Sequence, residues 1–263
     1  MTYFGFLLRF LMLPILALLF MILRDEQRRP PLEHFQNGRR VWAIIALHIA
    51  LALIYTTPWD NYLVANGVWT YNPPLVSGIL LGYVPLEEYL FFVLETFLAG
   101  LWWWFLARRL PEPPTFKPSS LGRRVAFAVL FLAWTVSAYL LFFGHLRWTY
   151  LSIILFWALP AIFPQFLIGA DILWHYRRLV GFGILVPGAY LSLIDIIALR
   201  ATTWSISKVH TTGVLFFGIL PLEEVVFFFI TNVLIIFGMT LMLSNLCRER
   251  FFTWKAHRFR GLP

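Results

Sequence analysis

Two pairs of adjacent glutamates stand inside long apolar stretches of this 263-residue chain. Both follow a Pro-Leu step, in LLGYVPLEEYLFF (80–92) and FFGILPLEEVVFF (216–228). Burial among apolar groups favours a neutral carboxyl, and two neighbouring carboxyls can share one proton. A neutral carboxyl beside a carboxylate is a proton donor beside a base, which predicts general acid–base chemistry. The four predicted catalytic residues are Glu87, Glu88, Glu223 and Glu224.

Aromatic side chains follow each glutamate pair at helical spacing. Phe92 lies four residues after Glu88, and Phe228 lies four after Glu224, so each acid shares a helix face with a ring. Aromatic faces stabilise cations by roughly 0.5–2 kcal/mol. An acid beside aromatic walls, in apolar surroundings, predicts protonation of an alkene in an apolar substrate.

The same face carries a further polar residue in each copy. Glu95 and Thr231 both stand seven residues past the second glutamate of their pair. These two side chains either line one pocket or join two helices by a hydrogen bond.

A structural role for the glutamate pairs is the alternative interpretation. The glutamates would then pair with cations. Alternatively, they would donate a hydrogen bond to a backbone carbonyl one turn earlier, which a helical Pro85 or Pro221 leaves free. Neither 75–106 nor 212–244 contains Lys or Arg, so a cationic partner would have to come from another segment.

The composition predicts an all-α integral membrane protein. The chain is 60% hydrophobic and 13% charged, whereas soluble domains contain about 25% charged residues. A spanning helix needs roughly 20 apolar residues, and the first apolar run is expected to be such a span rather than a removable signal peptide. The seven expected spans are 2–23, 41–57, 75–106, 123–143, 148–169, 180–198 and 212–244.

Basic residues alternate between the two sides of the expected membrane. Most of the 21 Lys and Arg residues follow the first, third, fifth and seventh spans. The positive-inside rule then predicts a cell-membrane protein whose N-terminus is outside and whose C-terminus is cytoplasmic. Basic loops that face anionic membrane lipids explain the net charge of +8 without a nucleic-acid partner.

The chain reads as two copies of one unit. Asp60 stands nine residues before Trp69, and Asp195 stands nine residues before Trp204. Spans one to three and five to seven are therefore expected to be parallel repeats, related by an axis along the membrane normal and joined by a fourth, scaffolding span. Their glutamate motifs would lie at equal depth, near the bilayer middle. The expected units are a first repeat (1–110), a linker and connector span (111–146), and a second repeat with a basic tail (147–263).

No sequence motif points to a bound cofactor or metal. The single Cys247 cannot form an internal disulfide, and the six histidines lack metal-ligand spacing. Nucleotide-binding and aspartate-rich diphosphate motifs are missing as well. We therefore expect no cofactor, although a dependence on a non-redox flavin stays open, as does the oligomeric state.

The repeated motif resembles the signature of the integral-membrane lycopene cyclase family, whose members occur as two subunits, as a fused chain or as part of a bifunctional enzyme. It stands here as PLEEYLFF (85–92) and PLEEVVFF (221–228), with TPWDNYLVANGVW (57–69) similar to a further family element. The second copy departs from the family at LIDIIALRATTW (193–204), which lacks the Pro-Trp before Asp and the Gly before Trp. The resemblance covers both halves of the chain, as in the fused form.

The resemblance implies cyclisation of the linear ψ-ends of lycopene to β-rings, giving γ-carotene and then β-carotene without net redox change. A neutral glutamate would protonate the terminal double bond, and a carboxylate would remove a ring proton. The substrate would be lycopene or a related apolar carotenoid taken from the bilayer. The implied substrate-binding residues are Pro85, Phe91, Phe92, Glu95, Pro221, Phe227, Phe228, Asp60 and Asp195, the two aspartates being equally suited to capping or loop anchoring.

Other functions stay open at this stage. One is cyclisation of a different carotenoid end group, or formation of another ring isomer. Another is a proton-coupled transporter, which also uses membrane acids in repeated halves. A seven-helix retinal receptor is disfavoured because 212–244 contains no lysine for a Schiff base. Pigment analysis in a lycopene-making host separates a cyclase from a transporter.

Overall fold

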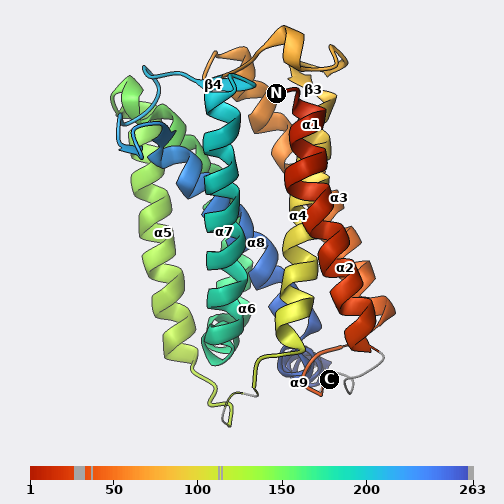
Figure 1. The fold of residues 1–263 in the computed structure, drawn as a ribbon. Coiled ribbons are helices and arrows are strands. Elements are labelled where there is room, and N and C mark those ends of the chain that lie inside the picture. Colours follow the sequence, from red (N-terminus) through yellow and green to blue (C-terminus); the bar gives the residue numbers. More distant parts are fainter. Residues whose placement is uncertain (27–32, 37, 112, 114, 260–263) are drawn as a thin grey trace.

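The structure is a bundle of long helices with short hairpins at one end (Figure 1). It is a computed structural model that describes residues 1–26, 33–36, 38–111, 113 and 115–259, with side chains described as far as 253. Within those residues, seven helices are long and apolar enough to cross a membrane. The predicted all-α membrane class is confirmed.

The first span changes helix type along its length. It begins with α1 (Tyr3–Leu7), continues through the π-helical turn η1 (Leu8–Met12) and ends with α2 (Leu13–Glu26). The other long helices are α3 (Arg39–Ala65), α4 (Leu86–Ala107), α5 (Ser120–Phe143), α6 (Thr149–His175), α7 (Arg177–Arg200), α8 (Leu222–Leu243) and α9 (Asn245–Phe259). The short elements are β1 (Trp69–Tyr71), η2 (Pro73–Leu75), β2 (Leu80–Leu81), β3 (Val84–Pro85), η3 (Leu146–Trp148), β4 (Trp204–Ile206), β5 (Leu215–Phe216) and β6 (Leu220–Pro221).

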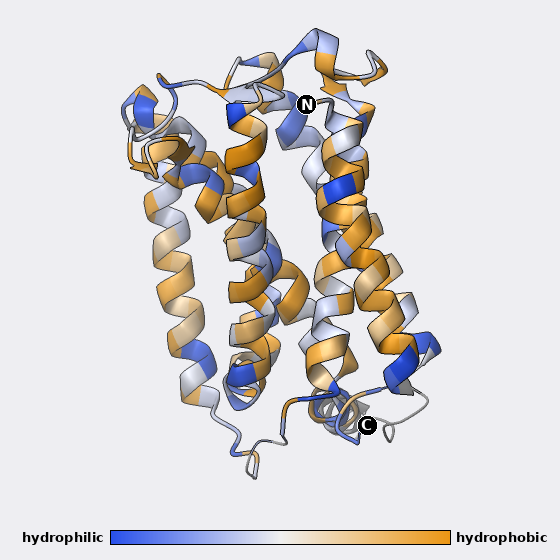
Figure 2. Ribbon diagram, viewed as in Figure 1, coloured by the Kyte–Doolittle hydropathy of each residue, from blue (hydrophilic) through white to orange (hydrophobic). Residues whose placement is uncertain are grey.

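Hydrophobic residues predominate along the middle of the long helices, and many hydrophilic ones lie towards the ends of the bundle (Figure 2). Helix α5 is the most peripheral span: only 6% of its apolar window is buried, and it packs mainly on α6. Exposed apolar side chains of this kind are expected where lipid, rather than water, is the solvent.

The third and seventh spans begin later than predicted. Residues 75–85 and 212–221 do not extend the helices but contain the hairpins β2–β3 and β5–β6. Gly82 and Gly218 turn these hairpins with φ of +73° and +70°, which glycine adopts without steric cost. Apolar composition alone does not separate such a hairpin from the start of a membrane helix.

The glutamate pairs consequently lie at helix beginnings. Pro85 and Pro221 occupy the N-cap positions of α4 and α8, and both glutamate pairs fall in the first turn. The predicted place of the motifs well inside their spans is therefore wrong, and so is the prediction that Pro85 and Pro221 are helical, because both stand at the N-cap. Both α4 and α8 run from the hairpin end of the bundle towards the end that carries α9 (Figure 1).

Prolines inside the first and fifth spans leave backbone carbonyls free for side chains of other helices. A helical proline frees the carbonyl four residues earlier. Pro14 frees that of Phe10, which accepts a hydrogen bond of 2.7 Å from the Tyr190 hydroxyl of α7. Pro160 frees that of Phe156, which accepts one of 3.1 Å from the Trp134 indole of α5. A side chain from another span thus satisfies the freed backbone group in each case.

The π-helical turn adds one residue to the first span. Tyr3 precedes Pro14 by eleven residues, whereas Tyr150 precedes Pro160 by ten. A π-turn is an α-helix with one residue inserted, so η1 absorbs this difference. Tyr3 and Tyr150 therefore occupy corresponding places at the start of their spans.

The two halves of the chain meet in a small antiparallel sheet. Strands β1 and β4, which follow the corresponding spans α3 and α7, pair so that Thr70 lies opposite Ser205. The hydroxyls of these two residues are 2.7 Å apart. Corresponding strands that pair antiparallel about a central residue pair have the geometry of a local two-fold axis. This axis agrees with the predicted parallel repeats, whose exact boundaries remain a prediction.

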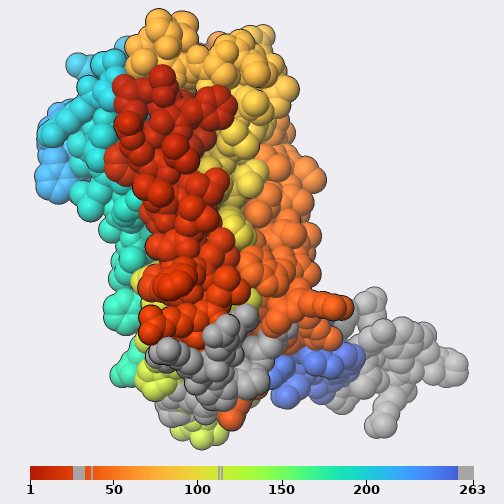
Figure 3. All heavy atoms as spheres, turned by 45° about the vertical axis from the view of Figure 1, so that its right-hand side comes forward, coloured from red at the N-terminus to blue at the C-terminus, as the bar shows by residue number. Residues whose placement is uncertain are grey.

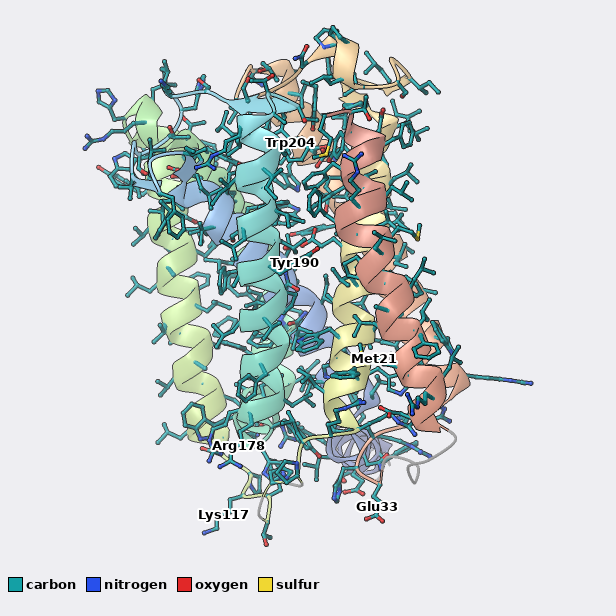
Figure 4. All side chains as sticks on the ribbon, in the orientation of Figure 1. Met21, Glu33, Lys117, Arg178, Tyr190 and Trp204 are labelled. Carbon is teal, nitrogen blue, oxygen red and sulfur yellow. The ribbon has the colours of Figure 1, made fainter. Side chains whose placement is uncertain are left out.

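A buried carboxylate joins three elements at the opposite end of the bundle, where Lys117 and Arg178 also lie (Figure 4). Asp171 of α6 accepts hydrogen bonds from the Arg123 side chain of α5 at 2.8 Å, and from the Ser119 backbone at 2.9 Å. The guanidinium of Arg250, from α9, binds both of its oxygens at 2.8 and 2.9 Å. The aspartate thereby fastens α9 to the bundle.

We predict that Asp171→Asn destabilises this junction. Hydrogen bonds to charged groups contribute roughly 1.5–3 kcal/mol, and the partly exposed arginines reduce that value, so we expect a loss of about 1–2 kcal/mol. Thermal unfolding of the purified protein in lipid nanodiscs measures this loss. Glu249→Gln, an exposed change of the same kind on α9, is the control. Equal melting temperatures for the two variants would contradict the assignment.

Candidate active site

The second glutamates of the two motifs line the same small cavity. Glu88 begins α4 and Glu224 begins α8, and both side chains are buried. The cavity between them has a volume of about 30 Å³, which is comparable with the volume of one water molecule. The predicted repeat therefore brings two carboxyl groups, 136 positions apart in the sequence, to one place.

Two tyrosine hydroxyls hold Glu88. The Oε2 atom of Glu88 accepts hydrogen bonds from Tyr3 at 2.6 Å and from Tyr71 at 3.0 Å. Burial, followed by the nearby Glu88 carboxyl, raises the pKa of the Tyr71 hydroxyl well above its ordinary value. Tyr71 of β1 therefore stays a neutral donor at any physiological pH.

Glu224 has the corresponding arrangement. Its Oε1 atom accepts hydrogen bonds from the Tyr150 hydroxyl at 2.6 Å and from the Trp69 indole at 3.3 Å. Tyr150 begins α6, just as Tyr3 begins the first span. Each tyrosine also packs against the tryptophan of the other half, with ring centroids 4.8 Å apart for Tyr3 and Trp204 and 5.7 Å apart for Tyr150 and Trp69.

The first glutamates of the motifs bind backbone instead. Glu87 accepts hydrogen bonds from the Ser77 amide at 2.5 Å and from the Ser77 hydroxyl at 3.0 Å. Glu223 accepts one from the Thr212 amide at 2.6 Å. These contacts fasten the segments that lead into each hairpin. The structure thus separates the four predicted catalytic residues into two that line the cavity and two that bind the segments leading into the hairpins.

The two predicted aspartates lie within helices, not at loop ends as expected. Asp60 belongs to α3 and Asp195 to α7, with exposed fractions of 0% and 1%. Asp195 lines the small cavity and accepts a 2.8 Å hydrogen bond from the Trp204 indole, which accounts for the Asp–x8–Trp spacing in the second half. Neither oxygen of Asp60 has a hydrogen-bonding partner within the described part of the chain. Capping is therefore excluded for both.

Aromatic rings wall the small cavity on the side of α4 and α8. Phe91, Phe227 and Phe228 line it, and the rings of Phe91 and Phe228 are 6.2 Å apart across the two helices. Pro85 and Pro221 line neither of the two cavities described here, although both were predicted to bind substrate. Their place at the N-cap instead sets where the glutamate-bearing helices begin.

A second, much larger cavity begins beside the first. Its volume is about 770 Å³, and Phe227 lines both cavities. Among its lining residues Glu95 is the only carboxylic acid, and the Thr231 hydroxyl donates to it at 2.6 Å. The two alternatives for Glu95 and Thr231 therefore both hold, since the side chains line one pocket and join α4 to α8. Phe92 also lines this cavity, whereas none of the four motif glutamates does.

Sequence reasoning missed the donors to the carboxyls. Tyr3, Tyr71 and Tyr150 are the residues concerned, together with Trp69, which was noted only as part of a spacing. A tyrosine ten or eleven residues before the proline of the first span in each copy was the available signal. No group of three or more His, Cys, Asp or Glu side chains in the described ranges is placed to hold a metal ion.

Known proteins with similar sequences agree with this architecture. The lycopene beta-cyclase of Halobacterium salinarum is 38% identical over 208 residues, which cover 78% of this chain and 84% of that protein. The bifunctional lycopene cyclase/phytoene synthase of Gibberella fujikuroi is 34% identical over 226 residues, or 82% of this chain and 37% of that protein. The same bifunctional enzyme of Podospora anserina is 34% identical over 205 residues, 73% of this chain and 34% of its own. No family model and no solved structure matches.

The fold and the site define a membrane-spanning helical bundle in which carboxyls and aromatic rings surround one internal cavity. The match to the Halobacterium protein covers most of both chains, and this extent establishes the family of the present chain. The chain belongs to the lycopene beta-cyclase family.

We predict that Tyr3→Phe and Tyr150→Phe each lower cyclase activity about 10- to 100-fold, because each removes one buried hydrogen bond to a carboxyl group. Conversion of carotenoid by membranes that contain equal amounts of protein gives the rates. Tyr190→Phe is the matched control, since it removes a tyrosine hydroxyl that donates only to the Phe10 carbonyl. If it lowered the rate as much as the other two, the tyrosines would have no special role at the carboxyls.

Proposed function

We propose that this protein cyclises the linear ends of lycopene to β-rings by acid–base catalysis inside the membrane. The observation that carries the proposal is the pair of corresponding carboxyls, Glu88 and Glu224, on one aromatic-walled cavity. The curated names of the relatives support the substrate class. The membrane setting suits an apolar carotenoid taken from the bilayer.

The reaction needs one proton donor and one proton acceptor, and it is balanced without any other reagent. A neutral carboxyl gives its proton to the terminal double bond of the ψ-end, leaving a tertiary cation. The internal double bond attacks this cation and closes a six-membered ring, which moves the positive charge to a ring carbon. A carboxylate then removes the adjacent ring proton, and a new double bond forms in the ring. The product is an isomer of the substrate.

Glu88 and Glu224 are the best-placed donor and acceptor. Both line the small cavity, so the pair holds the same number of protons after each turnover, and transfer of the proton from the acceptor back to the donor restores the starting state. Each carboxyl uses a single oxygen for its tyrosine partner, Oε2 in Glu88 and Oε1 in Glu224. The second oxygen of each group is thereby left for proton exchange.

The surrounding groups orient the acids and tolerate the cation. Hydroxyl donors fix the carboxyls before the substrate arrives, so little reorganisation is needed in the transition state. The rings of Phe91, Phe227 and Phe228 present faces and edges towards the same cavity, where a desolvated cation gains up to about 2 kcal/mol from each suitable ring face. Glu87 and Glu223 act indirectly, by holding the loops that close the site.

The remaining assignments are part of the same proposal. Residues 1–110 and 147–263 act as two repeats that share one site, and 111–146 connects them. The basic end of the bundle, which carries Lys117 and Arg178, faces the cytoplasm, and the hairpin end faces outside (Figure 4).

Expression in a lycopene-accumulating bacterial host, with chromatography of the pigments, tests the proposal. The unaltered chain is expected to convert lycopene to γ- or β-carotene. Glu88→Gln and Glu224→Gln should each lower conversion at least 100-fold, because general acid–base groups contribute typically 10²- to 10⁴-fold. Unchanged lycopene with well-inserted protein would contradict the proposal.

Glu87→Gln and Glu223→Gln separate the two roles within each motif. A glutamine oxygen still accepts the hydrogen bonds from Ser77 and Thr212, so we expect losses below tenfold for these variants. Glu249→Gln on the exposed side of α9 is the control for expression. Equal losses at all four motif positions would show that the first glutamates take part in the proton transfers themselves.

A further inference from the structure

We propose that the large cavity is the chain's one carotenoid site, and that it presents one end of the substrate at a time to both carboxyls. This inference rests on the proposed function. The two ends of a linear carotenoid would then be cyclised in separate binding events, with release of the monocyclic product between them.

The shape of the large cavity suits a polyene. Its lining runs along α8 from Phe227 to Met242, which is roughly 22 Å at 1.5 Å per helical residue. Its volume of about 770 Å³ falls within the range of roughly 300–1,000 Å³ that is usual for ligand pockets. Apart from Glu95, the charged residue on its lining is Arg248, at the start of α9. Most of the other lining side chains are apolar, so a long apolar molecule is the ligand that suits this wall.

One extremity of this cavity lies next to the small cavity that the catalytic carboxyls line. Phe227 separates the large cavity from the small one, and the Trp69 ring, which donates to Glu224, packs 5.8 Å from the Phe227 ring. The other extremity is lined by Arg248, Phe251 and Phe252 of α9. A linear molecule in this channel brings a single end to Phe227, and the rest of it points towards α9.

The other side of the local two-fold axis has matching contacts. On the cavity side, the Tyr55 hydroxyl of α3 donates to the Trp157 carbonyl of α6 at 2.8 Å. On the opposite side, the corresponding Tyr190 of α7 donates to Phe10 of the first span at 2.7 Å. The helices are therefore joined in the same way on both sides, and a second cavity would be possible on this framework.

Side chains differ at corresponding places on the two sides. Gly238 lines the cavity with the His48 ring packed directly against it, whereas the matching residue of α4 is Trp102, whose indole donates to the Phe182 carbonyl of α7 at 3.0 Å. Ala161 of α6 lines the cavity, whereas its counterpart in the first span is the buried Ile15. Figure 3 shows the first span as a continuous ridge between α7 on one side and α3 and α4 on the other.

One channel that ends at Phe227, beside the small cavity of both carboxyls, has a clear chemical consequence. Glu88 and Glu224 belong to different repeats but serve the same substrate end, so the repeats do not divide the two ends between them. A carotenoid with one finished ring must leave the channel and re-enter with its other end first.

A pulse–chase experiment with purified protein in lycopene-containing vesicles tests the release step. Labelled lycopene is supplied first, and a large excess of unlabelled lycopene follows after the first labelled γ-carotene appears. Release predicts that the chase lowers the later yield of labelled β-carotene at least fivefold, and labelled γ-carotene remains. A yield of labelled β-carotene that the chase leaves unchanged would overturn the inference. A chain that makes γ-carotene alone would support a site for one end, whereas no cyclised product at all would refute the proposed function instead.

Variants of the wall test the location of the site. Ala52→Trp on α3 and Ala161→Trp on α6 fill the cavity from two different helices, so we expect both to lower carotenoid turnover at least tenfold. Ala46→Trp is the matched control, because Ala46 is an exposed residue of α3 that does not line the cavity.

Bound pigment gives a readout that is independent of catalysis. The inactive Glu88→Gln variant should copurify with one lycopene per chain, and adding Ala161→Trp should reduce this to below 0.2, because the indole ring occupies the space of the polyene. Two lycopenes per chain, or full retention of pigment with both cavity positions filled, would place the polyene elsewhere and overturn the inference.

Discussion

The burial of two carboxyl groups beside one small cavity constrains the rest of the structure. A carboxyl removed from water loses several kcal/mol unless other groups bind it. Its donors here are Tyr3 and Tyr71 for Glu88, and Tyr150 and Trp69 for Glu224. They come from the first span, the fifth span and β1. The two halves must therefore pack in one register for either carboxyl to be satisfied, and the β1–β4 sheet supplies that register.

The position of the glutamates at helix beginnings makes this burial less costly. Free backbone N–H groups and the positive end of the helix dipole favour negative charge in the first turn. Glu87 and Glu88 in α4, and their counterparts in α8, occupy that turn. A mid-helix carboxylate would have no such support. The hairpins that precede the two helices thus serve the chemistry, because they place a helix N-terminus at the cavity.

The two halves of the chain make matching contacts, but the side chains between those contacts differ. The tyrosine-to-carbonyl hydrogen bonds of Tyr55 and Tyr190 occur on both sides of the local axis. The small Ala161 lines the cavity on one side, whereas the larger Ile15 is buried at the corresponding place on the other. A similar divergence distinguishes the tryptophans, since Trp204 binds Asp195 of its own half whereas Trp69 binds Glu224 of the other. Two corresponding halves can in this way form one carotenoid site, which the substrate enters from one direction.

The sequence by itself determined the membrane class, the presence of seven spans, the repeat and the glutamate pair in each copy of it. These features depend on composition and local spacing. Only the tertiary structure decided which carboxyls share a cavity. The partners of Glu88 and Glu224 lie 85 and 74 residues away, and no local pattern encodes such a distance. The residues at which α4 and α8 begin could not be predicted from the sequence either. An apolar hairpin such as 80–85 cannot be told from the start of a span by its composition. The shape of the large cavity depends on side chains from five helices, and packing alone brings them together.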